Sequence, residues 1–93
     1  MSSSLFDLTG KSALITGSSQ GIGFALAKGL AASGAKIILN GRDRTKLQAA
    51  ADNLSTTGAD VQTLGFDATD HDAVRAAVDG FEDTSGTIDI LVN

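Results

Sequence analysis

The 93-residue sequence has no cysteine, proline, tryptophan or tyrosine, and only four phenylalanines. Without cysteine there is no disulfide framework, no thiolate metal site and no thiol nucleophile. So few aromatic side chains leave little surface on which single-stranded nucleic acid can stack. No apolar run approaches the roughly 18–20 residues that cross a bilayer, and the N-terminus lacks the basic and apolar segments of a secretory signal. We therefore expect a cytoplasmic protein that binds neither nucleic acid nor membrane.

The charge balance points the same way. Eleven acidic residues against seven basic ones give a net charge of −4, which disfavours a uniformly basic surface for nucleic acid. Apolar residues make up 42% of the chain and charged residues 19%, enough apolar material for a packed core. The length predicts one domain at most.

Short apolar runs alternate with longer amphipathic stretches along the whole chain. The apolar runs predict buried strands at Ser12–Thr16, Lys36–Asn40, Val61–Phe66 and Ile88–Val92. The amphipathic stretches predict helices at Ile22–Ser33, Arg44–Thr56 and Asp70–Phe81. This β-α-β-α-β-α-β order predicts an α/β fold in which a parallel sheet is covered by helices on both faces.

Each predicted helix carries an apolar stripe that we expect to face the sheet. The three stripes are Ile22, Leu26, Gly29 and Leu30; Leu47, Ala50, Ala51 and Leu54; and Val74, Ala77, Val78 and Phe81. Gly34 and Gly58 are expected to end the first two helices, Gly34 with a left-handed backbone, and Thr69 or Asp70 to cap the third.

A glycine-rich turn, T-G-S-S-Q-G-I-G from Thr16 to Gly23, joins the first strand to the first helix. Gly17 lets the chain turn sharply, Gly21 lets a pyrophosphate approach the backbone, and Gly23 lets the helix pack closely on the strand. The amides at the start of the helix then face the phosphate, and serine hydroxyls add donors. The candidate phosphate-binding residues are Gly17, Ser18, Ser19, Gln20, Gly21, Ile22 and Gly23.

Two other interpretations apply to a glycine-rich turn of this kind. It can be a strand-to-helix connection with packing duties only, but the strand before it and the helix after it favour a nucleotide phosphate site. A Walker-type loop does not fit, because no Gly-Lys-Ser/Thr closes the turn. The triplet Gly10–Ser12 has that pattern but precedes the strand.

The pattern Thr-Gly-x-x-x-Gly-Ile-Gly resembles the cofactor fingerprint of the short-chain dehydrogenase/reductase family. The run Leu8–Gly17 resembles the family's entry into its first strand, Asp67–Thr69 its acidic turn after the third, and Ile90–Asn93 the start of its Asn-Asn-Ala-Gly motif. The resemblance covers essentially the whole chain. Among the family's branches it is strongest to the gluconate 5-dehydrogenases and then to the 3-oxoacyl-carrier-protein reductases.

The resemblance implies a Rossmann-type doubly wound parallel sheet with strand order 3-2-1-4. It implies an oxidoreductase that moves hydride between a nicotinamide cofactor and a secondary alcohol or ketone, such as gluconate and 5-ketogluconate. A homo-oligomer is also implied.

The end of the second strand bears on the choice of cofactor. An NAD site of this fold usually has an acidic residue there for the ribose 2′-hydroxyl, and the expected position is Gly41. At position 41 there is no carboxylate to repel a 2′-phosphate, and the guanidinium of Arg42 can bind that phosphate. NADP(H) is therefore the predicted cofactor. The alternative is that Arg42 is a solvated turn residue paired with Asp43, and that Asp43 is the acidic residue that binds the ribose.

The resemblance adds three residues to the candidate site. Asp67 is expected to accept from the adenine amine and Ala68 to offer its backbone, although Asp67 can also be a turn or cap residue. Asn93 is expected to contact the ribose through its backbone. His71 and the acidic residues around it suit a solvated helix face better than a metal site.

The family's chemistry depends on a tyrosine acid/base, a lysine four residues further on, a serine and an asparagine. None of these can be assigned here, so no catalytic residue is predicted.

We expect residues 1–93 to be an NADP-binding half-domain, truncated before the catalytic half, whose exposed fourth strand promotes self-association. A non-catalytic dinucleotide-binding module is the alternative. A methyltransferase-type fold is disfavoured because it needs an acidic residue where Gly41 and Arg42 stand.

Overall fold

The computed structural model describes residues 7–92, in which four strands alternate with three helices. The strands are β1 (Ser12–Ile15), β2 (Lys36–Asn40), β3 (Val61–Leu64) and β4 (Ile90–Val92). The helices are α1 (Gly21–Ala32), α2 (Arg44–Ser55) and α3 (His71–Ser85). Every predicted element is present. The main differences are at the ends, because α3 continues past Phe81, β3 stops at Leu64 and β4 begins at Ile90.

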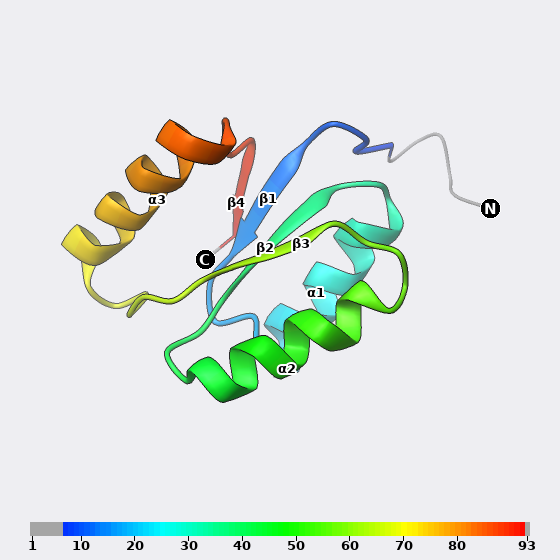
Figure 1. Ribbon diagram of the computed structural model, residues 1–93, viewed down its shortest axis with the longest axis horizontal. Coiled ribbons are helices and arrows are strands. Elements are labelled where there is room, and N and C mark those ends of the chain that lie inside the picture. The colour runs from blue at the N-terminus through cyan, green and yellow to red at the C-terminus, as the bar shows by residue number, and fades with distance from the viewer. Residues whose placement is uncertain (1–6, 93) are drawn as a thin grey trace.

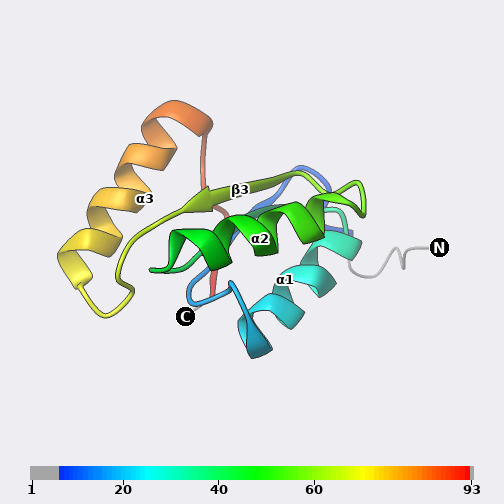
Figure 2. The same cartoon turned by 60° about the horizontal axis from the view of Figure 1, so that its bottom comes forward.

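All strand pairs are parallel, and the order β3-β2-β1-β4 confirms the predicted 3-2-1-4 arrangement. Ala13 of β1 lies opposite Ile37 of β2 on one side and Ile90 of β4 on the other. Helices α1 and α2 lie on one side of the sheet and α3 lies on the other (Figures 1 and 2). The doubly wound arrangement is therefore present in this chain.

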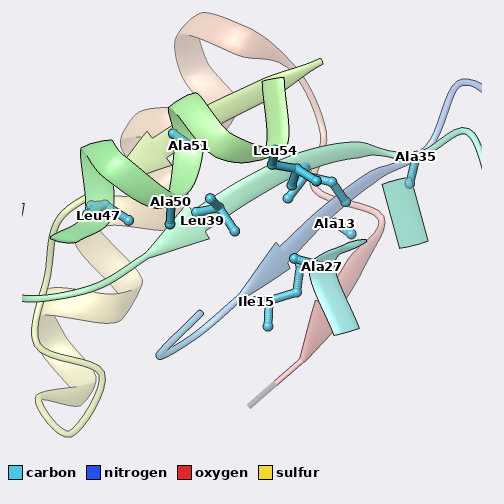
Figure 3. Packing of buried hydrophobic residues seen from close by; sticks show 10 residues of the cluster. Ala13, Ile15, Ala27, Ala35, Leu39, Leu47, Ala50, Ala51 and Leu54 are labelled. Carbon is cyan, nitrogen blue, oxygen red and sulfur yellow. The ribbon is translucent and has the colours of Figure 1, made fainter. Parts of the chain in front are cut away.

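Alternate strand residues point to opposite faces, so the core has two layers. One layer packs the sheet against α1 and α2; Figure 3 shows Ala50 of α2 near Leu39 of β2, and Ala27 of α1 near Ile15 of β1. The other packs the sheet against α3. Its buried members are Leu14, Ile38, Phe66 and Phe81. The inward stripes predicted for α2 and α3 are confirmed.

The inward face predicted for α1 is largely wrong. Ile22 is 83% exposed and Leu26 is 45% exposed, while Ala27 is buried against the sheet. Phe24 and Leu30 pack beside it, so Leu30 is the member of the predicted stripe that contacts the core. The reason lies in the sequence of α1, GIGFALAKGLAA, which is apolar almost all round and leaves hydrophobic periodicity little to distinguish. The small side chain of Ala27 then lets this side of α1 approach the sheet most closely.

The helix ends follow the sequence signals. Gly34 and Gly58 both adopt positive φ after α1 and α2, and Asp70 caps α3 by accepting from the amides of Asp72 and Ala73. No helix within residues 7–92 is long and apolar enough to cross a membrane.

Candidate functional site

The carboxyl ends of β1, β2 and β3 meet at a crevice of about 240 Å³. It is lined by the loop after β1, the end of β2 and the turn after β3. The lining residues are Gly17, Ser19, Gln20, Asn40, Gly41, Arg42, Phe66, Asp67, Ala68 and Thr69. In open parallel sheets, ligands bind outside the carboxyl ends of the strands, where the strand order reverses. Here that point is beside β1, which stands between β2 and β4.

The glycine loop folds tightly against the first turn of α1. Gly17 and Gly21 have φ of 60° and 66°, which residues with a β-carbon rarely adopt. A β-carbon on Gly23 would lie 2.6 Å from the carbonyl oxygen of Gly17 and 3.0 Å from the Cα of Ser18. Gly23 is therefore required for close packing, as the sequence predicts, but its immediate neighbour is the loop backbone after β1.

The start of α1 differs from the starts of α2 and α3. Its N-cap, Gln20, makes no side-chain capping hydrogen bond, and its first turn holds no acidic residue. By contrast, Asp43 caps α2 by accepting from the amide of Lys46, and Asp70 caps α3. The first-turn amides of α1 and the positive end of its dipole are thus available to an anion.

The two serines of the loop have different roles. The Oγ of Ser18 is buried and accepts a hydrogen bond of 2.9 Å from the amide of Asn40. Its hydroxyl is directed into the protein, which differs from the phosphate donor expected from the sequence. Ser19 lines the crevice and covers Gly41, since a β-carbon at position 41 would lie 3.1 Å from its Oγ. A carboxylate side chain at position 41 would need Ser19 to move.

Arg42 and Asp67, predicted from separate parts of the sequence, lie together at the crevice. The Nη1 of Arg42 is 3.5 Å from the Oδ2 of Asp67, and both side chains reach solvent. The alternative pairing of Arg42 with Asp43 is not what the structure shows, because the carboxylate of Asp43 caps α2. Arg42 therefore carries its positive charge to the edge of the crevice.

Asp67 combines a turn role with its place in the crevice. Its Oδ1 accepts hydrogen bonds from the amide and the hydroxyl of Thr69, at 2.9 Å and 2.7 Å. These bonds, and more weakly the neighbouring Arg42 guanidinium, hold the pKa of Asp67 below its ordinary value. Its carboxylate is consequently ionised at neutral pH and can accept from a ligand amine through Oδ2.

The remaining site predictions fare differently. Ala68 lines the crevice beside Asp67, while the exposed side chain of Ile22 is not among the lining groups. Asn93 lies outside the described residues. No cluster of three metal-ligating side chains occurs in residues 7–92.

Sequence reasoning missed Asn40 as a site residue. It is buried at the end of β2 and contributes to the crevice lining. The available signal was a polar residue closing the apolar run K-I-I-L-N, a position at which a buried amide must find hydrogen-bond partners.

The fold is that of a Rossmann-type α/β unit, and its crevice lies where such units bind nucleotides. The family model described as short chain dehydrogenase matches residues 11–93. The chain belongs to the short-chain dehydrogenase family.

Two curated relatives are named for sugar acids, one for gluconate and the other for 5-keto-D-gluconate. Gluconate 5-dehydrogenase of Gluconobacter oxydans is 48% identical over 89 residues, covering 96% of this chain and 35% of that protein. The 5-keto-D-gluconate 5-reductase of Escherichia coli is 44% identical, with the same coverage. The chain thus spans about a third of the length of these relatives.

Two solved structures share the fold and contain a cofactor. Gluconate 5-dehydrogenase of Burkholderia cenocepacia, in complex with NADP and tartrate, has a TM-score of 0.85 and 46% identity, over 92% of this chain and 34% of that one. L-sorbose reductase of Gluconobacter frateurii, complexed with NADPH and L-sorbose, has a TM-score of 0.86 and 40% identity, over 95% and 34%.

Proposed function

We propose that this chain binds NADP(H) in the crevice, as the cofactor-binding part of a short-chain oxidoreductase that interconverts a secondary alcohol and a ketone. The observation that carries the proposal is the guanidinium of Arg42 at the crevice, next to Gly41, where a site for NAD usually has a carboxylate. The names of the relatives support gluconate and 5-ketogluconate as the substrate pair.

Each part of the crevice has a role in the proposal. The uncapped amides of the first turn of α1, with Gly17 in the loop before it, bind the pyrophosphate. Arg42 binds the 2′-phosphate with its forked donors, and Asp67 and Ala68 contact the adenine. The bound nicotinamide supplies or accepts the hydride.

Calorimetric titration with NADPH and NADH tests the proposal. We expect NADPH to bind about 10- to 100-fold more tightly, as suits a charge-assisted contact to one phosphate. Arg42→Ala should bring the two affinities together. Arg75→Ala, which removes an equal charge from the exposed face of α3, should leave the preference intact. Equal affinities in the unchanged protein, or no binding by a folded protein, would overturn the proposal.

A second function is a dinucleotide-binding module without turnover. It applies to residues 1–93 taken by themselves, which contain no tyrosine to act as the acid/base that the family resemblance implies. Oxidation of gluconate or reduction of 5-ketogluconate by this chain would contradict the module. Binding of NADPH without either reaction would support it. The cytoplasmic location and the homo-oligomer remain predictions.

A further inference from the structure

Asn40 is 1% exposed, and both polar atoms of its side chain are hydrogen-bonded. Its Oδ1 accepts from the amide of Gly17 at 2.9 Å. Its Nδ2 donates to the carbonyl oxygens of Leu64 at 3.0 Å and Phe66 at 3.1 Å. The side chain therefore links the glycine loop after β1 to the segment that leaves β3.

The backbone of Asn40 strengthens the same connection. Its amide donates to the Oγ of Ser18, and its carbonyl oxygen accepts from the amide of Ser18 at 2.8 Å. Three segments far apart in sequence are thus joined at one residue, and all three line the crevice. The amide of the side chain can take only one orientation, because turning it over would oppose its NH₂ group to the Gly17 N–H.

We propose that Asn40 is a positioning residue that fixes the glycine loop against the turn carrying Asp67, so that dinucleotide affinity depends on its side-chain amide. The dinucleotide in this inference rests on the proposed function, whereas the coupling of the two segments does not. Among the side chains lining the crevice, Asn40 is the buried one that contacts both segments.

Replacement residues show why an amide is needed. Alanine would leave the Gly17 N–H and two carbonyl oxygens without these partners. An ionised aspartate can still accept from Gly17, but it offers no donor and its charge faces two carbonyl oxygens. A protonated aspartate regains one donor. Asn40→Asp should therefore respond to pH in a way that the native amide cannot.

The charged groups around position 40 do not change state over the pH range of this experiment. Two charged side chains line the crevice: Arg42, which follows β2, and Asp67, which follows β3. A guanidinium stays protonated, and the pKa of Asp67 lies below its ordinary value. The segment Gly17–Gln20 carries no charged side chain. A pH response between 5 and 8 that appears only in the variant then reports the new carboxyl.

The experiment compares NADPH affinity of Asn40→Asp, Asn40→Ala and the unchanged protein between pH 5 and pH 8. We expect Asn40→Ala to lose about tenfold or more at every pH. Asn40→Asp should lose a similar factor at pH 8 and recover part of it at pH 5, when expressed as a ratio to the unchanged protein. Asn53→Asp adds the same charge on the exposed side of α2 and should give a ratio near one throughout.

A measurement without ligand separates this inference from the proposed function. Hydrogen exchange at the Gly17 amide should be faster in Asn40→Ala than in the unchanged protein or Asn53→Asp, even if no dinucleotide binds. If Asn40→Ala does not fold, Asn40→Thr, which keeps one donor, should show faster exchange at the Gly17 amide and weaker NADPH binding than the unchanged protein. Native affinity and native Gly17 exchange in the folded variants would overturn the inference.

Discussion

At the scale of single residues, Arg42 and Asp67 bring opposite charges to the same edge of the crevice. Their ion pair is open to solvent, so it is screened and readily exchanged for another partner. Asp67 is also fixed by Thr69 and keeps its charge when Arg42 turns away. Arg42 is therefore free to contact a phosphate without leaving a buried carboxylate unpaired.

The preference for NADPH over NADH should decrease as the pH falls from 8 to 5. A phosphate monoester has its second pKa near 6, so the 2′-phosphate loses part of its attraction for Arg42 below that pH. Asp67 does not cause the change: its lowered pKa keeps it ionised in this window, and its contribution is lost only as the pH falls through that lowered value. The ratio of the two dissociation constants, measured at several pH values, checks this.

In Arg42→Ala the same ratio should be close to one and flat with pH. A preference that stays constant in the unchanged protein would indicate that no single phosphate group distinguishes the two cofactors at this site.

A crevice residue could be predicted from the sequence where its position follows from the end of a predicted strand. Gly17, Arg42 and Asp67 follow directly from the ends of predicted strands. The inward hydroxyl of Ser18 and the role of Asn40 could not be predicted, because they depend on which carbonyls and amides a third segment brings near. Such pairing is a property of tertiary structure.

At the scale of the elements, two of the three glycines of α1, Gly23 and Gly29, have opposite expected behaviour. A β-carbon on Gly23 would press on the loop backbone at 2.6 Å, whereas one on Gly29 would meet nothing within 4 Å. Gly23→Ala should therefore lower the free energy of unfolding by about 1–3 kcal/mol through overpacking. Gly29→Ala should raise it by about 0.5–1 kcal/mol, as is usual in a helix interior.

Urea unfolding followed by circular dichroism measures both changes, and each variant serves as the control for the other. Equal stability of the two variants would contradict the close approach of α1 to the loop.

The order and type of the elements could be read from the sequence because strands and helices alternate with different periods and glycine separates them. The face of α1 could not, since Ile22 and Leu26 are as apolar as the residues that pack inward. For α2 the polar residues leave one apolar side, and the stripe predicted there is confirmed.

At the scale of the whole molecule, large apolar side chains remain on the surface of residues 7–92. They are Ile22, Leu26 and Leu91, and Leu91 is 51% exposed on β4 at an edge of the described sheet. An apolar edge strand is a template for pairing with another chain. We expect this chain to associate with itself as its concentration rises, with Leu91→Lys weakening the association.

Sedimentation velocity over a range of concentrations provides the test. A monodisperse monomer at every concentration, unfolding in one cooperative transition, would show that this exposed surface does not drive association. Thr63→Lys, on the exposed part of the opposite edge strand β3, is the matched control and should leave the association unchanged.

The uncapped start of α1 links the stability of the protein to its surroundings. The side chain of Gln20 does not cap those amides, so a ligand held there favours the native state over the unfolded one. A coenzyme at 100 times its dissociation constant would add about 2.7 kcal/mol to the free energy of unfolding. The fraction of molecules that survive heating or proteolysis would then rise with the concentration of coenzyme.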